Sequence, residues 1–215
     1  MRPLLRELVP IFERVHGATV EPEFRLSAAV KRAIQDGAIF DLALLPRPEL
    51  DELIVFGAIV PDNAVDVARS TVGLAVRAGA SKPDIGSVDA LRRTLLQARS
   101  IGYSDGPSGA YVAGLLVKLG IAEAVAAKVK LTSGPVAELV ARDEAELGMQ
   151  QIIAILPVAG AQLVGPLPAE LQNVIIYAAG VSSRAAAAAV AKAFLAFMRG
   201  KEAKQLMRAN GLDPA

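Results

Sequence analysis

Cysteine and tryptophan are absent from this chain of 215 residues, and histidine occurs once, as His16. Without cysteine the chain can form no disulfide framework, no thiolate metal site and no cysteine nucleophile. A single histidine cannot build a polyhistidine metal centre. We therefore expect neither a metal nor another cofactor.

An excess of charge of one sign is also lacking, because 23 Lys and Arg residues face 22 Asp and Glu residues, for a formal net charge of +1. Nucleic-acid-binding domains normally carry a basic excess that releases counterions from phosphates. A small ligand is therefore expected rather than a nucleic acid. The hydrophobic fraction of 53% excludes a disordered chain, because so much apolar surface can offset the entropy lost on folding.

Long uninterrupted hydrophobic runs are missing as well. Pro157 and Pro166 break the apolar stretch 152–167, and Lys192 interrupts the stretch 185–198, whereas a bilayer-spanning helix needs roughly 18 apolar residues in a row. The N-terminus enters an amphipathic pattern directly and shows no signal-peptide pattern. We expect no membrane insertion, and a chain that is either cytoplasmic or a mature or truncated form.

What the chain does contain is an alternation of helical and strand patterns, with a turn-rich connection at Pro46–Asp51. This alternation predicts an α/β fold with mostly parallel sheets covered by helices. The length, at roughly 150 residues per domain, fits one large unit or two small lobes. We expect helices over 4–16, 27–34, 88–97, 110–119, 122–127, 136–142, 185–199 and 201–209, and strands over 19–24, 40–45, 54–59, 72–76, 100–103, 129–131, 147–150 and 174–178.

Three short loops rich in Ser, Gly or Pro lead from an expected strand directly into a helix, at 24–28, 104–110 and 132–136. A helix start leaves backbone N–H groups unpaired at the positive end of the helix dipole, and an adjacent Ser, as at Ser27, adds a donor and caps the helix. In parallel sheets such loops lie at the carboxyl edge, where ligands of α/β folds bind. The local chemistry favours anion binding and simple helix capping about equally.

Other polar residues give weaker signals. Tyr111 lies beside the second loop and could donate to a ligand, but core packing explains it equally well. His16 precedes a glycine that ends a helix, which favours a structural role. The sequence offers no nucleophile with a positioned base, so we expect no catalytic residue and no enzyme. An acidic cluster is interpreted as a solvated surface: Glu138, Asp143, Glu144 and Glu146.

Several motifs occur in an order typical of one known family. Residues 21–45 contain Phe and Ser three positions apart, followed by Ile, Gly-Ala and Asp before an apolar run, and residues 107–111 are Pro-Ser-Gly-Ala-Tyr. Together with residues 69–77, 134–150 and 191–211, these segments resemble the bacterial periplasmic molybdate-binding proteins, the solute-binding components of ABC transporters. The resemblance covers nearly the whole chain.

The resemblance implies the two-lobed type II periplasmic binding protein fold. One lobe would combine residues 1–72 with 178–215, the other would comprise 77–173, and the hinge crossings would lie near 73–76 and 174–177. Ligand would bind in the cleft between the lobes, which close over it. The family begins with a strand and a Ser-bearing loop that this chain lacks, so we expect the first strand to be missing through a truncated or misassigned start.

Family positions carry over to individual residues. Ser27 matches a serine that donates to the oxyanion, and Gln150 lies near a position where the family often has tyrosine. Arg25 stands where glycine is common, and a guanidinium could bind a carboxylate through two hydrogen bonds. The expected ligand-binding residues are Ser27, Ser108, Gly109, Ala110, Pro135, Val136 and Gln150, and further candidates are Arg25, Asp105, Tyr111 and Ser133.

The resemblance thus implies a periplasmic receptor that captures a small oxyanion such as molybdate or tungstate and presents it to the membrane permease of an ABC transporter. Neutral donors in the loops favour a fully deprotonated anion. Two alternatives stay open: a receptor for a small carboxylate or another organic anion, and a cytoplasmic effector-binding sensor of the same fold.

Overall fold

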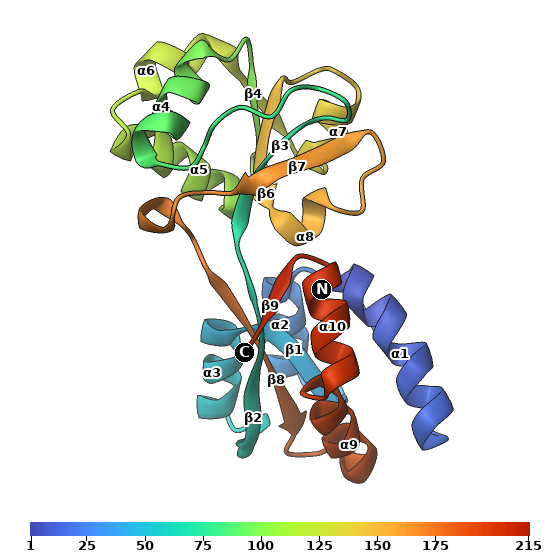
Figure 1. The fold of residues 1–215 in the computed structure, drawn as a ribbon. Helices are drawn as coiled ribbons and strands as arrows, with labels where there is room; N and C mark the ends of the chain where they lie inside the picture. The colour runs from blue at the N-terminus through green and yellow to red at the C-terminus, as the bar shows by residue number, and fades with distance from the viewer. The chain divides into compact units, whose positions relative to one another are not determined.

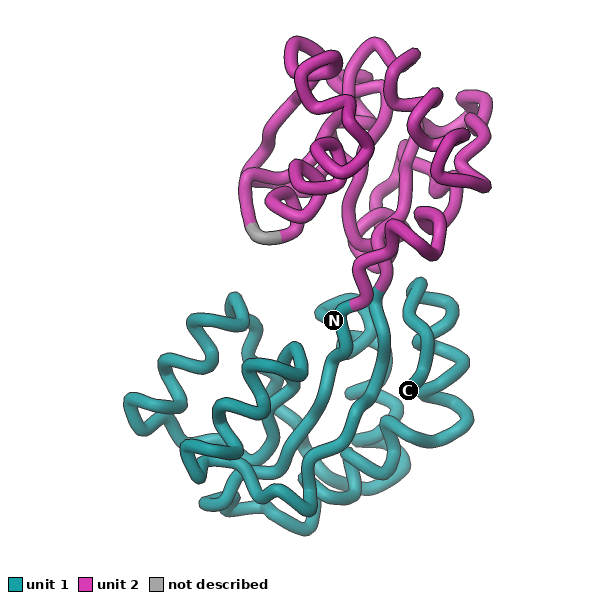
Figure 2. Tube along the Cα trace, turned by 90° about the vertical axis from the view of Figure 1, so that its left-hand side faces the viewer, with its two compact units in different colours: residues 1–70, 175–215 teal, residues 71–174 magenta. Residues whose placement is uncertain are grey.

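The computed structural model describes residues 1–106 and 108–215. Its chain forms two compact units, coloured separately in Figure 2. Unit 1 contains Met1–Ser70 and Ile175–Ala215, and unit 2 contains Thr71–Val174. Each unit has its own sheet and its own hydrophobic core.

The sheet of unit 1 has the strand order β1-β8-β2-β9. All its pairings are antiparallel. The chain leaves unit 1 through β2 and returns through β8, so these two neighbouring strands necessarily run in opposite directions. The strands are β1 (Leu42–Pro46), β2 (Ile59–Ser70), β8 (Ile175–Ser182) and β9 (Leu212–Pro214).

Helices cover both faces of this sheet (Figure 1). On one face Leu50 and Leu53 are fully buried. On the other, the Phe12 ring lies 4.9 Å from that of Phe194 and stacks on His16 at 4.3 Å, which gives His16 a packing role. The first face carries α2 (Ser27–Gln35) and α3 (Arg47–Val55), and the second carries α1 (Arg2–His16), α9 (Ala188–Met198) and α10 (Lys201–Ala209).

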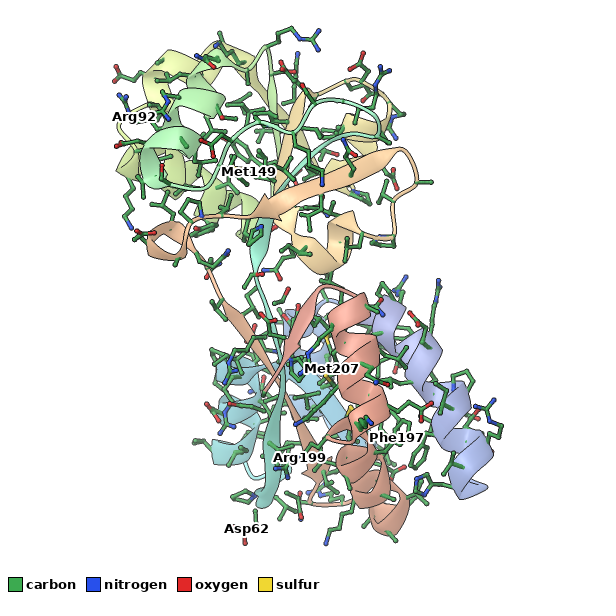
Figure 3. All side chains as sticks on the ribbon, in the orientation of Figure 1. Asp62, Arg92, Met149, Phe197, Arg199 and Met207 are labelled. Atoms are coloured by element: carbon green, nitrogen blue, oxygen red, sulfur yellow. The ribbon has the colours of Figure 1, made fainter. Side chains whose placement is uncertain are left out.

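The sheet of unit 2 is mixed, with the order β5-β4-β6-β3-β7. Strand β4 runs parallel to β5 and β6, whereas β3 is antiparallel to β6 and β7. Met149, labelled in Figure 3, is buried in the core of this unit. The strands are β3 (Val72–Arg77), β4 (Ile101–Ser104), β5 (Val129–Thr132), β6 (Leu147–Gln151) and β7 (Ala161–Pro166).

The helices of unit 2 fall into two groups in Figure 1. Helices α4, α5 and α6 lie on one side of the sheet, and α7 and α8 lie on the other. Leu91 and Leu95 of α4 pack into the core with no exposed surface. The helices are α4 (Val88–Gln97), α5 (Pro107–Lys118), α6 (Ala122–Val125), α7 (Val136–Ala141) and α8 (Ile152–Ile155), with short 3-10 turns at Ala126–Lys128 and Ala169–Leu171.

The α/β class and the two-lobed type II fold are confirmed, but the expectation of mostly parallel sheets is wrong. Parallel pairing is confined to β4, β5 and β6, which are joined through helices. The strands that connect the two units pair antiparallel with their neighbours. In the pairs β2–β8 and β3–β7, one strand leads into a unit and the other leads out of it. The alternation of helices and strands does not reveal these long-range connections.

Two local predictions in unit 1 are also wrong. Residues 19–24 form no strand, because Pro22 has no N–H for a ladder and residues 21–23 are exposed. The segment predicted as a turn at 46–51, with a strand at 54–59, is instead largely helix α3. Pro46 caps this helix and Pro48 lies in its first turn, where proline is well tolerated.

Within residues 1–106 and 108–215, no single helix is long and apolar enough to cross a membrane. One pair of helices, Ser108–Lys118 and Ala122–Lys128, reaches the required length and composition only when combined, and the two are bent by 120°.

Candidate functional site

Two of the three predicted loops meet at one edge of the unit 2 sheet. Strands β5, β4 and β6 are neighbours and run parallel, so their carboxyl ends share an edge. The N–H of Asp105 donates to the Thr132 carbonyl at 3.0 Å, which joins the loops after β4 and β5. Gln150 lies level with Ser104, because Gly148 pairs with Gly102. We call the residues 104–110, 132–136 and Gln150 the donor edge.

The loop after β4 turns tightly into α5. The Ser104 and Ser108 hydroxyls lie 2.9 Å apart and share a hydrogen bond. The N–H groups of Gly109 and Ala110 donate to the Gly106 carbonyl at 2.9 and 3.0 Å. The Gly109 and Ala110 amides are therefore engaged in the first helical turn, and the serine hydroxyls are the side-chain donors of this loop.

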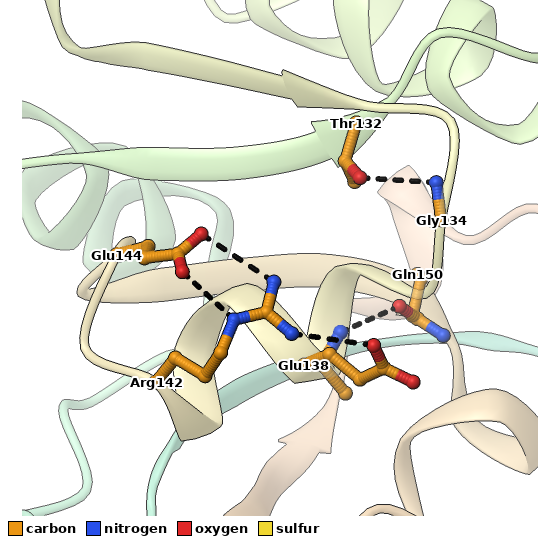
Figure 4. A network of polar contacts seen from close by, with 7 residues as sticks. Thr132, Gly134, Glu138, Arg142, Glu144 and Gln150 are labelled. Atoms are coloured by element: carbon orange, nitrogen blue, oxygen red, sulfur yellow. Dashed lines mark hydrogen bonds and ion pairs between the residues drawn. The ribbon is translucent and has the colours of Figure 1, made fainter.

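Gln150 is the most buried polar side chain of the donor edge, with 7% of its surface exposed. Its Oε1 accepts a hydrogen bond from the Ala137 N–H at 2.9 Å, as Figure 4 shows. This bond fixes the orientation of the amide, because only the oxygen can accept from an N–H. No residue in the described part of the chain accepts from Nε2, so its two hydrogens can serve a ligand.

The third loop leads into α7, whose Ala137 N–H holds this amide. Pro135 precedes α7 in an extended conformation, and Val136 is the buried first residue of the helix. The Thr132 hydroxyl accepts from the Gly134 N–H at 3.0 Å (Figure 4), which shapes the turn. Ser133 is exposed beside it. The loop thus presents one serine hydroxyl to solvent, and the helix that follows it holds Gln150.

Two of the further candidates differ in their surroundings. Asp105 is exposed at the donor edge. The Tyr111 hydroxyl donates to the Leu171 carbonyl, and burial raises the pKa of this phenol above its usual range. Tyr111 therefore ties α5 to the segment that follows β7, and its proton is already committed to a backbone acceptor.

The acidic cluster next to α7 is a paired surface, as the sequence predicts. Arg142 binds Glu144 at 2.7 Å and Glu138 at 3.3 Å (Figure 4). The hydrogen bond from Arg142 holds the pKa of Glu144 below its usual range. Asp143 faces Arg77 at 4.0 Å, and Glu146 faces Arg99 at 3.2 Å.

The first predicted loop belongs to unit 1. Ser27 is the first residue of α2 rather than its N-cap, which is Leu26. Its hydroxyl donates to Glu49 Oε1 at 3.3 Å instead of capping the helix. The Arg25 guanidinium is exposed and paired with Glu23.

Sequence reasoning missed Glu49 because residues 46–51 were interpreted as a turn, although proline followed by an acidic residue typically marks the first turn of a helix. Tyr177 on β8 was also missed. It pairs with Pro46 on β1, and burial together with the charge of Glu49 raises its pKa above the usual range.

Fold and site together define a two-lobed α/β binding protein with a donor-lined sheet edge. The sequence model of the family described as bacterial extracellular solute-binding protein matches residues 1–213. The chain belongs to this family of ABC-transporter-type solute-binding proteins. The predicted resemblance to solute-binding components of ABC transporters is therefore confirmed.

A curated relative, aconitate isomerase from Pseudomonas sp, is 31% identical over 217 residues, covering 98% of this chain and 83% of the relative. The fold is shared with the substrate-binding domain of a putative molybdenum ABC transporter from Clostridium difficile, at a TM-score of 0.84, 16% identity and coverage of 100% and 94% of the two chains. It is also shared with the periplasmic molybdate-binding protein of Azotobacter vinelandii, at a TM-score of 0.75 and 21% identity. This match covers 98% of this chain and 94% of that protein.

The expectation that the chain is not an enzyme is contradicted by the first of these comparisons. A relative that bears an enzyme's name matches almost the whole chain. The prediction rested on the absence of a nucleophile paired with a base, and that argument covers nucleophilic catalysis only. Isomerisation by proton transfer needs one base and no nucleophile.

Proposed function

We propose that this protein binds a small carboxylate anion of the aconitate class and interconverts its isomers. The observation that carries this proposal is the 31% identity to aconitate isomerase over 98% of the chain. The family description supports an extracellular location and a small ligand. A second role in delivering the anion to an ABC permease is compatible with the same fold.

The donor edge supports this proposal through neutral donors. The Nε2 hydrogens of Gln150 and the hydroxyls of Ser108 and Ser133 can donate to carboxylate oxygens without adding positive charge. Hydrogen bonds to a charged group contribute about 1.5–3 kcal/mol each when the donor is held in place. Gln150 is held by its bond to Ala137, so little side-chain entropy is lost when the anion binds.

The chemistry of aconitate defines what the enzyme must do. Aconitate has a methylene group that is both next to a carboxylate and allylic to the double bond. Removal of a methylene proton and its return to the other end of the allyl system moves the double bond. The product has the same constitution, and the geometry of its new double bond decides whether it is the cis or the trans isomer.

Proton NMR of the purified protein with cis-aconitate or trans-aconitate tests this activity, and titration calorimetry with both isomers, molybdate and sulfate tests the ligand. We expect heat with aconitate and conversion of one isomer into the other. Heat from molybdate alone, with no conversion of either aconitate isomer, would overturn the proposal.

Replacement of Gln150 tests the donor edge. Gln150→Glu keeps an oxygen for the Ala137 N–H but exchanges the free amide donor for a carboxylate. We expect the dissociation constant for aconitate to rise at least about tenfold, which corresponds to about 1.4 kcal/mol. Gln162→Glu is the matched control, because it adds the same charge to unit 2 on the edge strand β7, where the Gln162 amide donates to the Ala80 carbonyl.

An oxyanion receptor of the molybdate type is the second candidate. It is favoured by the neutral donors of the two joined loops, since a fully deprotonated tetrahedral anion needs donors and no acceptor. Asp105 is the carboxylate of this edge and is exposed. The same calorimetric titration separates the candidates, because this one requires molybdate to bind and aconitate to give no heat.

A further inference from the structure

Three polar side chains gather at one end of the unit 1 sheet. The Ser27 hydroxyl, at the start of α2, donates to Glu49 Oε1 at 3.3 Å. Glu49 lies in the first turn of α3, three residues after Pro46. Tyr177 on β8 pairs with Pro46 across the sheet and experiences the charge of Glu49. We call these residues the Ser27–Glu49–Tyr177 group.

Among the described residues, Glu49 differs from the other acidic residues of α3 in forming no ion pair. Asp51 binds Arg47 at 2.8 Å, and Glu52 binds Lys31 at 2.6 Å. For Glu49, the interaction within the described residues is the hydrogen bond from Ser27, and no ion pair involves it there. A half-buried carboxylate that accepts one hydrogen bond from a neutral donor keeps lone pairs that can take a proton.

We infer that Glu49 is the base that transfers the proton in the isomerisation. This inference rests on the proposed function. The Glu49 carboxylate takes a proton from the methylene carbon of aconitate, so that a C–H bond breaks, an O–H bond forms, and the electron pair is delocalised over the allyl system. The same O–H then gives its proton to the other terminal carbon, which restores the carboxylate and completes the shift of the double bond.

The neighbours of Glu49 suit this role. The Ser27 hydroxyl fixes one carboxylate oxygen and leaves the other for the substrate. Tyr177 carries its proton at neutral pH, as a tyrosine with the usual pKa of about 10 does, and burial and the Glu49 charge raise the pKa of its phenol further. It therefore adds no second negative charge where a substrate anion approaches. Ser27 is therefore a positioning residue for Glu49.

The test compares Glu49→Gln with Glu52→Gln, two substitutions of the same kind on one helix. Proton NMR measures the rate of isomer conversion and, in deuterated water, the exchange of the methylene protons. We expect Glu49→Gln to lower both rates by about 100-fold or more, the usual contribution of a general base. Glu52→Gln should retain the rates of the unsubstituted protein. Calorimetry should give dissociation constants for both variants within about threefold of the unsubstituted protein.

The outcomes separate the two proposals. Conversion at the original rate by Glu49→Gln overturns the assignment of the base and leaves the proposed function standing. Absence of conversion by the unsubstituted protein overturns the proposed function and the role of Glu49 together. Should Glu49→Gln not fold, Glu49→Asp supplies the decision, because it keeps the carboxylate: a partly retained rate supports the inference, and an unchanged rate overturns it.

Discussion

A methyl group at Gly109 tests whether the donor edge depends on the close contact between α5 and the end of β4. An added Cβ at this position would lie 2.5 Å from the Ser104 carbonyl carbon, still closer to its oxygen, and 3.1 Å from the Ser104 Oγ. Real Cβ atoms essentially never approach another atom closer than 3.0 Å. The obstacle is backbone, so no side-chain rotation relieves the clash in Gly109→Ala, and the start of α5 must move away from β4.

The expected magnitude follows from this geometry. Overpacking that flexible side chains can absorb costs about 1–3 kcal/mol, and a clash with fixed backbone belongs at the upper end, near 3 kcal/mol. Gly114 lies on the same helix with open space around its Cβ position. Gly114→Ala should stabilise the protein by up to about 1 kcal/mol, because alanine has the higher helix propensity. The two variants should therefore differ by about 4 kcal/mol.

Urea unfolding followed by circular dichroism and tyrosine fluorescence measures this difference. The chain has three tyrosines and no tryptophan, and Tyr103 and Tyr111 both lie in unit 2 beside this loop, so the emission reports mainly on the relevant unit. Because Ser108 moves with the start of α5, binding of aconitate to Gly109→Ala should also weaken. An unfolding free energy for Gly109→Ala within about 0.5 kcal/mol of the unsubstituted protein would refute the reasoning.

Two further predictions concern single side chains. The Gln172 amide binds the backbone at the start of β3, since its Oε1 accepts from the Val72 N–H at 2.7 Å and its Nε2 donates to the Val72 carbonyl at 3.0 Å. Gln172→Ala should therefore lower the free energy of unfolding in urea by about 2 kcal/mol. An unchanged unfolding midpoint would contradict this role. The pKa of Tyr177 should lie above the usual tyrosine value of about 10 because of burial and the charge of Glu49. The contribution of this raised pKa to folding stability is therefore complete below about pH 10, the unfolded-state pKa, and is lost as the pH rises through the folded-state pKa. Alkaline difference absorbance, referenced to Tyr177→Phe, should show this transition at lower pH in Glu49→Gln but not in Glu52→Gln, and equal shifts in both variants would exclude a direct effect of Glu49.

The elements that the sequence predicts well are those whose pattern comes from local burial. Helix α4 has the predicted bounds Val88–Gln97, with a Ser87 N-cap that accepts from the Ala90 N–H. Helix α1 ends at His16, and the capping residue Gly17 has the left-handed φ of 61° that its position after the last helical turn predicts. In both helices the apolar spacing is set by one buried face, so a short window of sequence contains the whole signal.

Strand β2 cannot be predicted from a short window of sequence, because its pairing is irregular. Its pairing with β8 shifts register between Ile59 and Ala64 and again between Asp66 and Ala68. Each irregularity changes which side chains face the core, so the alternation expected of a strand is broken. The sequence therefore predicts only a short strand at 54–59, which shares the single residue Ile59 with β2.

In the donor edge, too, features that depend on neighbouring residues are predictable from the sequence, and features that depend on distant contacts are not. The loops after β4 and β5 are predictable, because glycine, proline and serine before a helix are local signals. The part played by Gln150 is not, since it depends on a hydrogen bond to the Ala137 N–H thirteen residues away. That bond exists only once α7 has packed against β6.

Helix α3 was not predicted from the sequence, and it contains Glu49, the residue that we infer to be the base. Pro46 and Pro48 suggest a turn when taken alone, yet their places relative to Glu49 are those of a helix start, with proline in the first turn and an acid facing the positive end of the dipole. Because a helix begins there, Glu49 is directed toward Ser27 of α2 rather than left on a flexible connection. The same feature that made this segment hard to predict therefore fixes Glu49, which forms no ion pair within the described residues and keeps lone pairs for the proton that we infer it transfers.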